Sequence, residues 1–128
     1  MNSRTFQRAR RDLLLGLIAA HPVIEEVLIE RRRQIKVEGF DTAHDDAHTD
    51  GSIADAAASF ATTRMKLIAR LWPKSWNFTW FRFESRRHAL IKAATLLVAE
   101  IERLDRAAAA KYRTELDLGN KVGRCQMK

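Results

Sequence analysis

Apolar residues recur at helical spacing over most of the chain. Near the start they occupy Phe6, Leu13, Leu17 and Ala20. This period predicts a helix from about Ser3 to Ala20 whose apolar face docks on a core. The basic start followed by LLLGLIAA loosely imitates a signal peptide, but Asp12 interrupts the apolar run, so we interpret the segment as a helix of the domain.

A second helix is predicted from Pro22 to about Glu38. Proline is suited to the first helical turn, and Gly39 is suited to the end of the helix. The inward side of its first half is expected to hold Val23, Ile24, Val27 and Leu28. The same side becomes polar in the second half, at Glu30, Arg31, Gln34 and Glu38. Such residues normally face solvent, so this stripe indicates a polar interior.

Two further helices follow. The third is predicted from about Ser52 to Leu71, with an apolar stripe that also contains Arg64: Ile53, Ala57, Phe60, Leu67 and Leu71. The fourth is predicted from about Glu84 to Glu115, with a broad core face: Leu90, Ala93, Ala94, Leu97, Ile101 and Leu104. Glu100 falls inside this arc, where a carboxylate is costly unless an arginine or a cation accompanies it.

These patterns predict an all-α protein. About four helices would form a bundle, with an acidic loop after the second helix and an aromatic loop before the fourth. Residues 1–116 would form one domain and residues 117–128 a flexible tail. Five glycines and two prolines in 128 residues disfavour a β-sandwich. A single cysteine excludes an internal disulfide, and we expect a cytoplasmic protein without a membrane span.

Charge is unevenly distributed. The net charge is +7, yet residues 25–55 contain nine acidic and only four basic residues. Within them, the stretch EGFDTAHDDAHTDG from Glu38 to Gly51 holds five carboxylates and two histidines. The basic remainder could attract phosphates, nucleic acid or an acidic protein, whereas the acidic segment favours a cation.

The acidic residues predict a metal site. Glu30, Glu38 and Glu100 would converge from two helices and hold Mg²⁺ or Mn²⁺, which prefer carboxylate oxygens. Asp45 or Asp46 would add a ligand or orient an attacking water. The alternative is that Glu30 and Glu100 form core ion pairs with Arg31, Arg64 or Arg86. Zinc at His44 and His48 is disfavoured, because the glutamate of a helical metalloprotease motif is missing.

The segment LWPKSWNFTWFRF interleaves aromatic and basic residues. It either folds over the end of the bundle, with Trp72, Trp76 and Trp80 filling the core, or stacks on nucleobases, or binds a partner protein. Arg86 and Arg87 follow near the start of the fourth helix, where phosphate binding is favoured. The candidate substrate-binding residues are therefore Gln34, Arg64, Arg86, Arg87, Lys92, Trp76 and Trp80.

Several stretches resemble a family of small, mostly uncharacterised bacteriophage and prophage proteins. They are ERRRQIKVEG, HDD, the Gly51 to Ala57 segment, WP, and KAATLLVAEIER, and together they span about Glu30 to Arg106. This resemblance implies a phage origin, and it implies an activity less directly.

The acidic residues on two helices are also similar in kind to the all-α nucleoside triphosphate pyrophosphohydrolases of the MazG type, which hold magnesium with E-x-x-E and E-x-x-D pairs. ERLD at Glu102 to Asp105 fits the second pair, whereas Glu26 and Glu30 are four residues apart instead of three. This resemblance implies a magnesium-dependent hydrolase that forms homo-oligomers. The alternatives are a phage accessory protein that binds a host or defence protein, and a nucleic-acid binder.

Overall fold

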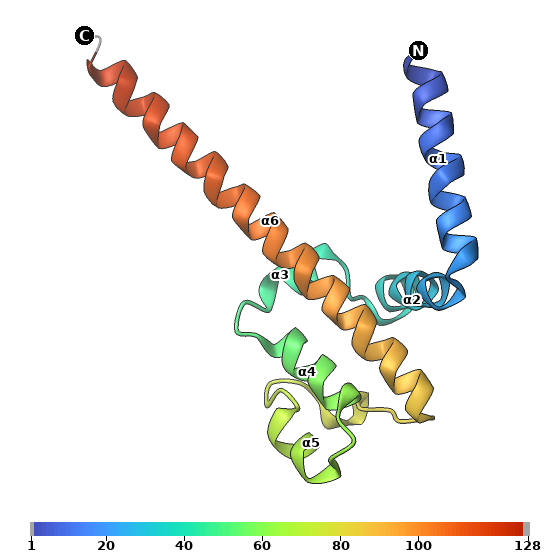
Figure 1. Ribbon diagram of the computed structural model, residues 1–128. Coiled ribbons are helices and arrows are strands. Elements are labelled where there is room, and N and C mark those ends of the chain that lie inside the picture. The colour runs from blue at the N-terminus through green and yellow to red at the C-terminus, as the bar shows by residue number, and fades with distance from the viewer. Residues whose placement is uncertain (1, 127–128) are drawn as a thin grey trace.

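The computed structural model describes residues 2–126, which contain helices and no strand (Figure 1). The helical segments are α1 (Ser3–Ala20), α2 (Pro22–Arg33), the π-helix η1 (Gln34–Glu38), α3 (Thr42–Ala47), α4 (Ser52–Ala61), α5 (Met65–Leu71), the 3₁₀-helix η2 (Phe78–Trp80) and α6 (Arg86–Gln126). The predicted all-α class is confirmed. The structure has six α-helices and does not confirm a bundle of about four.

Helix α6 organises the fold. Its first half packs against α4 and α2 and also touches α3, while α5 packs on α4. In Figure 1, α6 runs diagonally through the molecule, with α4 and α5 below it and α2 beside it. The core is small and is formed by Ile53, Ala56, Ala57, Phe60, Trp72, Trp76, Ala89, Ala93, Leu96 and Ala99. Trp72 and Trp76 therefore fill the core, as one interpretation of the aromatic segment predicts, whereas Trp80 is half exposed.

The bounds of the second helix are as predicted. Pro22 occupies its first turn, and Gly39 ends it with a φ of 76°, in the left-handed region. The Gly39 N–H donates to the Gln34 carbonyl and closes the π-turn, and the Phe40 N–H donates to the same carbonyl over 3.0 Å. The buried polar stripe is also confirmed at Glu30, Arg31 and Gln34, whereas of the predicted apolar residues only Val27 is buried.

The third predicted helix is broken in two. Thr62 adopts extended backbone angles, and its hydroxyl accepts a hydrogen bond from the Arg64 N–H over 3.1 Å. This local turn competes with helix continuation, a tendency of threonine that periodicity does not reveal. Arg64 consequently lies at the start of α5, exposed, and not in an apolar stripe.

Helix α6 buries Ala93 as predicted, but most of the predicted face stays exposed. Leu90, Leu97, Ile101 and Leu104 are exposed, and the contacts with the core are made by Ala89, Ala93, Leu96 and Ala99. Small side chains allow a neighbouring helix to approach closely, and α4 presents Ala56 and Ala57. The larger side chains are left on the outside.

The two ends of the chain project from this core. Helix α1 contains no buried residue and contacts α2, so the prediction that it docks on the core is wrong. At the other end, α6 extends to Gln126 through most of the segment predicted to be a flexible tail, and residues 107–126 are exposed. Residues 1, 127 and 128 lie outside the described residues. No helix within residues 2–126 is long and apolar enough to cross a membrane.

Candidate functional site

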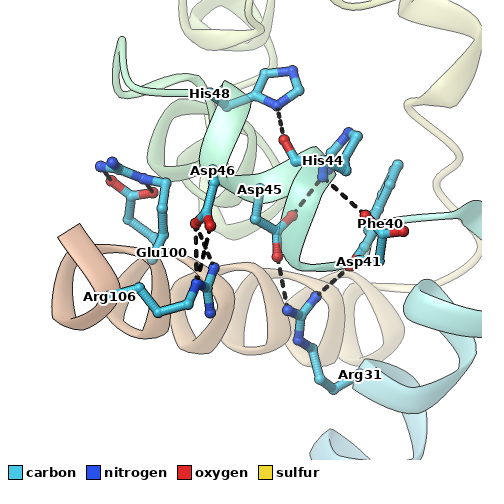
Figure 2. Close-up of polar contacts among 10 residues, drawn as sticks. Arg31, Phe40, Asp41, His44, Asp45, Asp46, His48, Glu100 and Arg106 are labelled. Carbon is cyan, nitrogen blue, oxygen red and sulfur yellow. Dashed lines mark hydrogen bonds and ion pairs between the residues drawn. The ribbon is translucent and has the colours of Figure 1, made fainter. Parts of the chain in front are cut away.

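The acidic segment folds around the short helix α3. Asp41 caps this helix, because its carboxylate accepts a hydrogen bond from the His44 N–H over 2.9 Å. The His44 ring stacks on Phe40 with 4.6 Å between the ring centroids, and Nδ1 of His48 lies 2.7 Å from the His44 carbonyl oxygen (Figure 2). Asp41, His44 and His48 therefore stabilise the conformation of this segment.

Asp45 joins α3 to α2. Its side chain is 2% exposed, and Oδ2 accepts a hydrogen bond from Arg31 over 2.7 Å. The other oxygen, Oδ1, lies 2.9 Å from Nδ1 of His44 (Figure 2). Arg31 also donates to the Phe40 carbonyl over 3.2 Å. The two charges of this buried pair thus neutralise each other, although Nε of Arg31 has no hydrogen-bond partner among the described residues.

Asp46 joins α3 to α6. It accepts hydrogen bonds from Arg106 at 2.8 and 3.0 Å, and both side chains remain partly exposed. The two residues predicted to be catalytic, Asp45 and Asp46, therefore have arginine partners that position α3 (Figure 2). A catalytic role for either residue stays a prediction.

The predicted metal ligands are also paired with arginines. Arg33 bridges Glu30, at 2.8 Å, and Glu38, at 2.9 Å. Glu100 binds Arg103 on its own helix at 2.7 Å, and the Arg103 charge interacts with Asp46 as well. Ion pairing is thus present, although the partners differ from the predicted Arg31, Arg64 and Arg86. Glu30 and Glu38 therefore share one arginine, whereas Glu100 pairs with a different one.

Within residues 2–126, no three or more histidine, cysteine, aspartate or glutamate side chains are grouped so that they could hold a metal ion. A divalent cation at Glu30 and Glu38 would have to displace Arg33 from both carboxylates. Magnesium or manganese binding stays a prediction.

The acid–base behaviour of Glu30 gives the first testable prediction. Burial alone would raise the pKa of Glu30, but hydrogen bonds from Arg33 and the nearby charges of His88 and Lys92 outweigh it, so the pKa lies below 4.5. Ionised Glu30 therefore stabilises the fold above pH 4.5, and this contribution is lost as the pH falls through the lowered pKa. We expect the melting temperature of Glu30→Gln to fall less steeply than that of the parent protein as the pH drops below 4.5.

The control for this measurement is Glu102→Gln, an exposed glutamate on α6. Its acid profile should match that of the parent protein. A Glu30→Gln profile as steep as the parent's would show that Glu30 does not contribute to acid unfolding.

A pocket opens beside Glu38. Its volume is about 140 Å³, and five of its lining residues are aromatic: Phe40, Phe60, Trp72, Trp76 and Trp80. The remaining lining residues are Arg33, Gln34, Glu38, Arg82, Lys92 and Leu96. The Trp72 and Trp76 rings meet edge to face with centroids 5.8 Å apart, and Trp76 meets Trp80 similarly at 6.1 Å. The α2–η1 segment, the aromatic connector and α6 thus enclose one aromatic cavity.

Lys92 is the most unusual residue of this pocket. It is 8% exposed, and its ammonium group donates to the Arg82 carbonyl over 3.0 Å and lies 5.5 Å from the Phe60 ring centroid. No ion pair formed among residues 2–126 includes it, although its charge lowers the pKa of Glu30. A buried cation without a direct counter-ion is costly. An ammonium group has three donors, so Lys92 retains capacity to bind an anion.

Three buried polar atoms of the pocket residues also lack hydrogen-bond partners. They are Oε1 of Gln34 and the Nε1 atoms of Trp72 and Trp76. Buried polar groups in folded proteins are nearly always hydrogen-bonded, so each exception needs a cause. These pocket-lining residues thus hold one acceptor and two donors for which the described residues supply no partner.

The pocket unites four of the seven predicted substrate-binding residues: Gln34, Lys92, Trp76 and Trp80. The other three lie elsewhere. Arg64 is exposed at the start of α5, Arg86 donates to the Thr62 carbonyl over 3.2 Å, and Arg87 pairs with Glu26 at 2.7 Å.

Sequence reasoning missed Arg33 and Phe40 as pocket residues. A signal for Phe40 existed, because it is an aromatic residue directly after the Gly39 that ends the second helix.

Comparisons with known proteins give no guide to this site. No protein-family model matches the chain, and neither a curated protein nor a solved structure is significantly similar to it.

Proposed function

We propose that the aromatic pocket binds a planar aromatic ligand with an anionic group, and that this ligand is a nucleotide. The observation that carries the proposal is the buried ammonium of Lys92, which lies in the wall of an aromatic cavity without a carboxylate partner. A phosphate would supply the missing negative charge. The aromatic walls would hold the base, since every nucleobase has a face that stacks on aromatic rings.

The size of the cavity favours a single ring. A cavity of roughly 150 Å³ accommodates benzene, and this pocket measures about 140 Å³. A pyrimidine is therefore a better match than a purine. The sugar and further phosphates would extend past Trp80 and Arg82, which are both exposed at the rim.

The unpaired polar atoms match the edge of a pyrimidine. The indole N–H groups of Trp72 and Trp76 would donate to ring carbonyl oxygens, and Oε1 of Gln34 would accept from a ring N–H or an exocyclic amine. A ligand that satisfies these three atoms removes the cost of leaving them buried and unpaired. This polar pattern supports a nucleobase over an apolar ring.

The proposal extends to catalysis, in which the protein hydrolyses the bound nucleotide. Glu38 lines the pocket and Arg33 joins it to Glu30, so a metal ion that displaced Arg33 would be held near a bound phosphate. Such an ion would stabilise the negative charge that develops during phosphoryl transfer. The resemblance to MazG-type enzymes makes release of pyrophosphate the reaction to assay.

Binding can be measured by tryptophan fluorescence, because all three tryptophans line the pocket. UTP, CTP and ATP should be titrated with and without Mg²⁺. We expect quenching, with tighter binding of the pyrimidine nucleotides. Lys92→Met should weaken binding at least about tenfold, since a charge-assisted contact is worth more than 1.4 kcal/mol, and the unliganded variant should be no less stable because it removes an unpaired buried charge.

The matched control is Lys66→Met, the same change at an exposed lysine of α5. It should bind like the parent. Equal affinities of the parent and Lys92→Met, or no quenching by any of the three nucleotides, would refute nucleotide binding. Binding without pyrophosphate or phosphate release would retain the binding function and remove hydrolysis.

A further inference from the structure

Helix α6 carries a second apolar face that nothing within residues 2–126 covers. This outer stripe consists of Leu90, Ala94, Leu97, Ile101, Leu104, Ala108 and Tyr112. Its large members are exposed, although together they form a stripe of the width expected for a core. The same helix buries Ala89, Ala93, Leu96 and Ala99 against the core. Helix α6 is therefore apolar on two sides, of which the chain itself uses one.

The spacing of the outer stripe is that of a helix–helix contact. From Leu90 to Leu104 the steps alternate between four and three residues. This repeat averages 3.5 residues, which keeps one seam of a helix facing a partner helix. A flat or disordered partner would not require such a repeat, so the pattern indicates that another α-helix covers this face.

Helix α1 exposes a similar stripe. Phe6, Ala9, Leu13, Leu17 and Ala20 lie along one side of it, and the helix has no buried residue. In Figure 1, α1 and the C-terminal half of α6 project in different directions from the core, and α1 touches α2. The two stripes are therefore both uncovered within one copy of the described chain.

Together the two stripes are large enough for a specific interface. Their large side chains are between 43% and 65% exposed. Taking roughly 150 Å² for each fully exposed large side chain, the two stripes offer on the order of 700 Å² of apolar surface. A standard interface buries about 800 Å² on each partner.

We propose that a second copy of this chain covers these stripes, with α1 and the outer stripe of α6 forming the interface between the two copies. A second copy supplies helices with the required repeat. Its own two stripes are also uncovered, so one association would cover the four stripes of the two copies. Each copy keeps its own pocket, because the pocket uses Lys92 and Leu96 on the inner side of α6.

An anionic membrane surface is the competing partner for α1. The opposite face of α1 is basic, with Arg4, Arg8 and Arg11, as in helices that lie in a lipid interface. A membrane would cover α1 but would not account for the heptad spacing on α6. The second copy accounts for both helices and is the inference we draw.

Sedimentation equilibrium of the full chain tests this proposal. At about 50 μM, the parent should have twice its monomer mass, and Leu97→Glu with Ile101→Glu should shift it to the monomer. Both residues are exposed in the single copy, so the core should stay folded, and the near-ultraviolet circular dichroism of the buried Trp72 and Trp76 should be preserved. The milder pair Leu97→Gln with Ile101→Gln, which should weaken association at least about tenfold, covers the case in which the glutamate variant does not fold.

The matched control is Ala110→Glu, which places one glutamate on the opposite side of α6 and should leave the dimer intact. A parent that sediments as a monomer at this concentration, or a dimer that both stripe variants leave unchanged, would overturn the proposal. Sedimentation of a monomeric parent with phosphatidylserine vesicles, lost on replacing Leu13 with Glu, would assign α1 to a membrane instead.

Discussion

Asp45→Ala is expected to lower the free energy of unfolding by about 3–5 kcal/mol, the range for removing one partner of a buried ion pair. The substitution would leave the guanidinium of Arg31 buried at 8% exposure with only the Phe40 carbonyl as a hydrogen-bond partner. It would also free His44 Nδ1 from its carboxylate (Figure 2). Urea unfolding at pH 7, followed by circular dichroism, measures the loss.

The neighbouring residue provides the control. Asp46→Ala removes an ion pair from the same helix, but Asp46 and Arg106 are partly exposed, so a loss of no more than about 1 kcal/mol is expected. Replacing Arg31 with Met in the Asp45→Ala background should restore part of the stability, because no unpaired charge remains. Equal losses for the two aspartates would contradict the buried pair as the main anchor of α3.

Phe60→Ala is expected to cost about 3–5 kcal/mol, the usual effect of truncating a buried phenylalanine. The Phe60 ring stacks on Phe81 with centroids 4.9 Å apart, meets Trp72 edge to face at 5.9 Å, and lies beneath the Lys92 ammonium. Its loss would leave a cavity continuous with the pocket and remove a cation–π contact from a buried charge. Thermal and urea unfolding would both report the change.

Phe83→Ala is the matched control. Phe83 is an exposed phenylalanine in the same connector, so its truncation should change the free energy of unfolding by no more than about 0.5 kcal/mol. A loss for Phe60→Ala no larger than this would mean that the centre of the core lies elsewhere.

The sequence predicted best where one local signal decided the structure. Pro22 and Gly39 set the bounds of the second helix, and the polar residues on its inner side marked Glu30, Arg31 and Gln34 as buried. Four of the residues predicted to bind substrate line one pocket, because buried polar and aromatic residues on neighbouring elements have few places to meet.

The prediction failed where partner choice decided the structure. The spacing of Leu90, Leu97, Ile101 and Leu104 indicates a packed helix face, but not whether the partner belongs to the same chain. Here the less conspicuous alanine face is the one that α4 covers. The sequence likewise does not show which acids form ion pairs. Glu30 and Glu38 are predicted as metal ligands, but Arg33 lies between them and pairs with both.

The length of α6 has a thermodynamic consequence. Residues 107–126 contain no buried side chain, so only local hydrogen bonds and neighbouring side chains hold this part of the helix. Helical stretches without tertiary contacts are marginal in water, since most helical stability in proteins comes from the packing of an apolar face. The far half of α6 thus lies close to the balance between helix and coil, and a partner helix that covered Ala108 and Tyr112 would shift this balance towards helix.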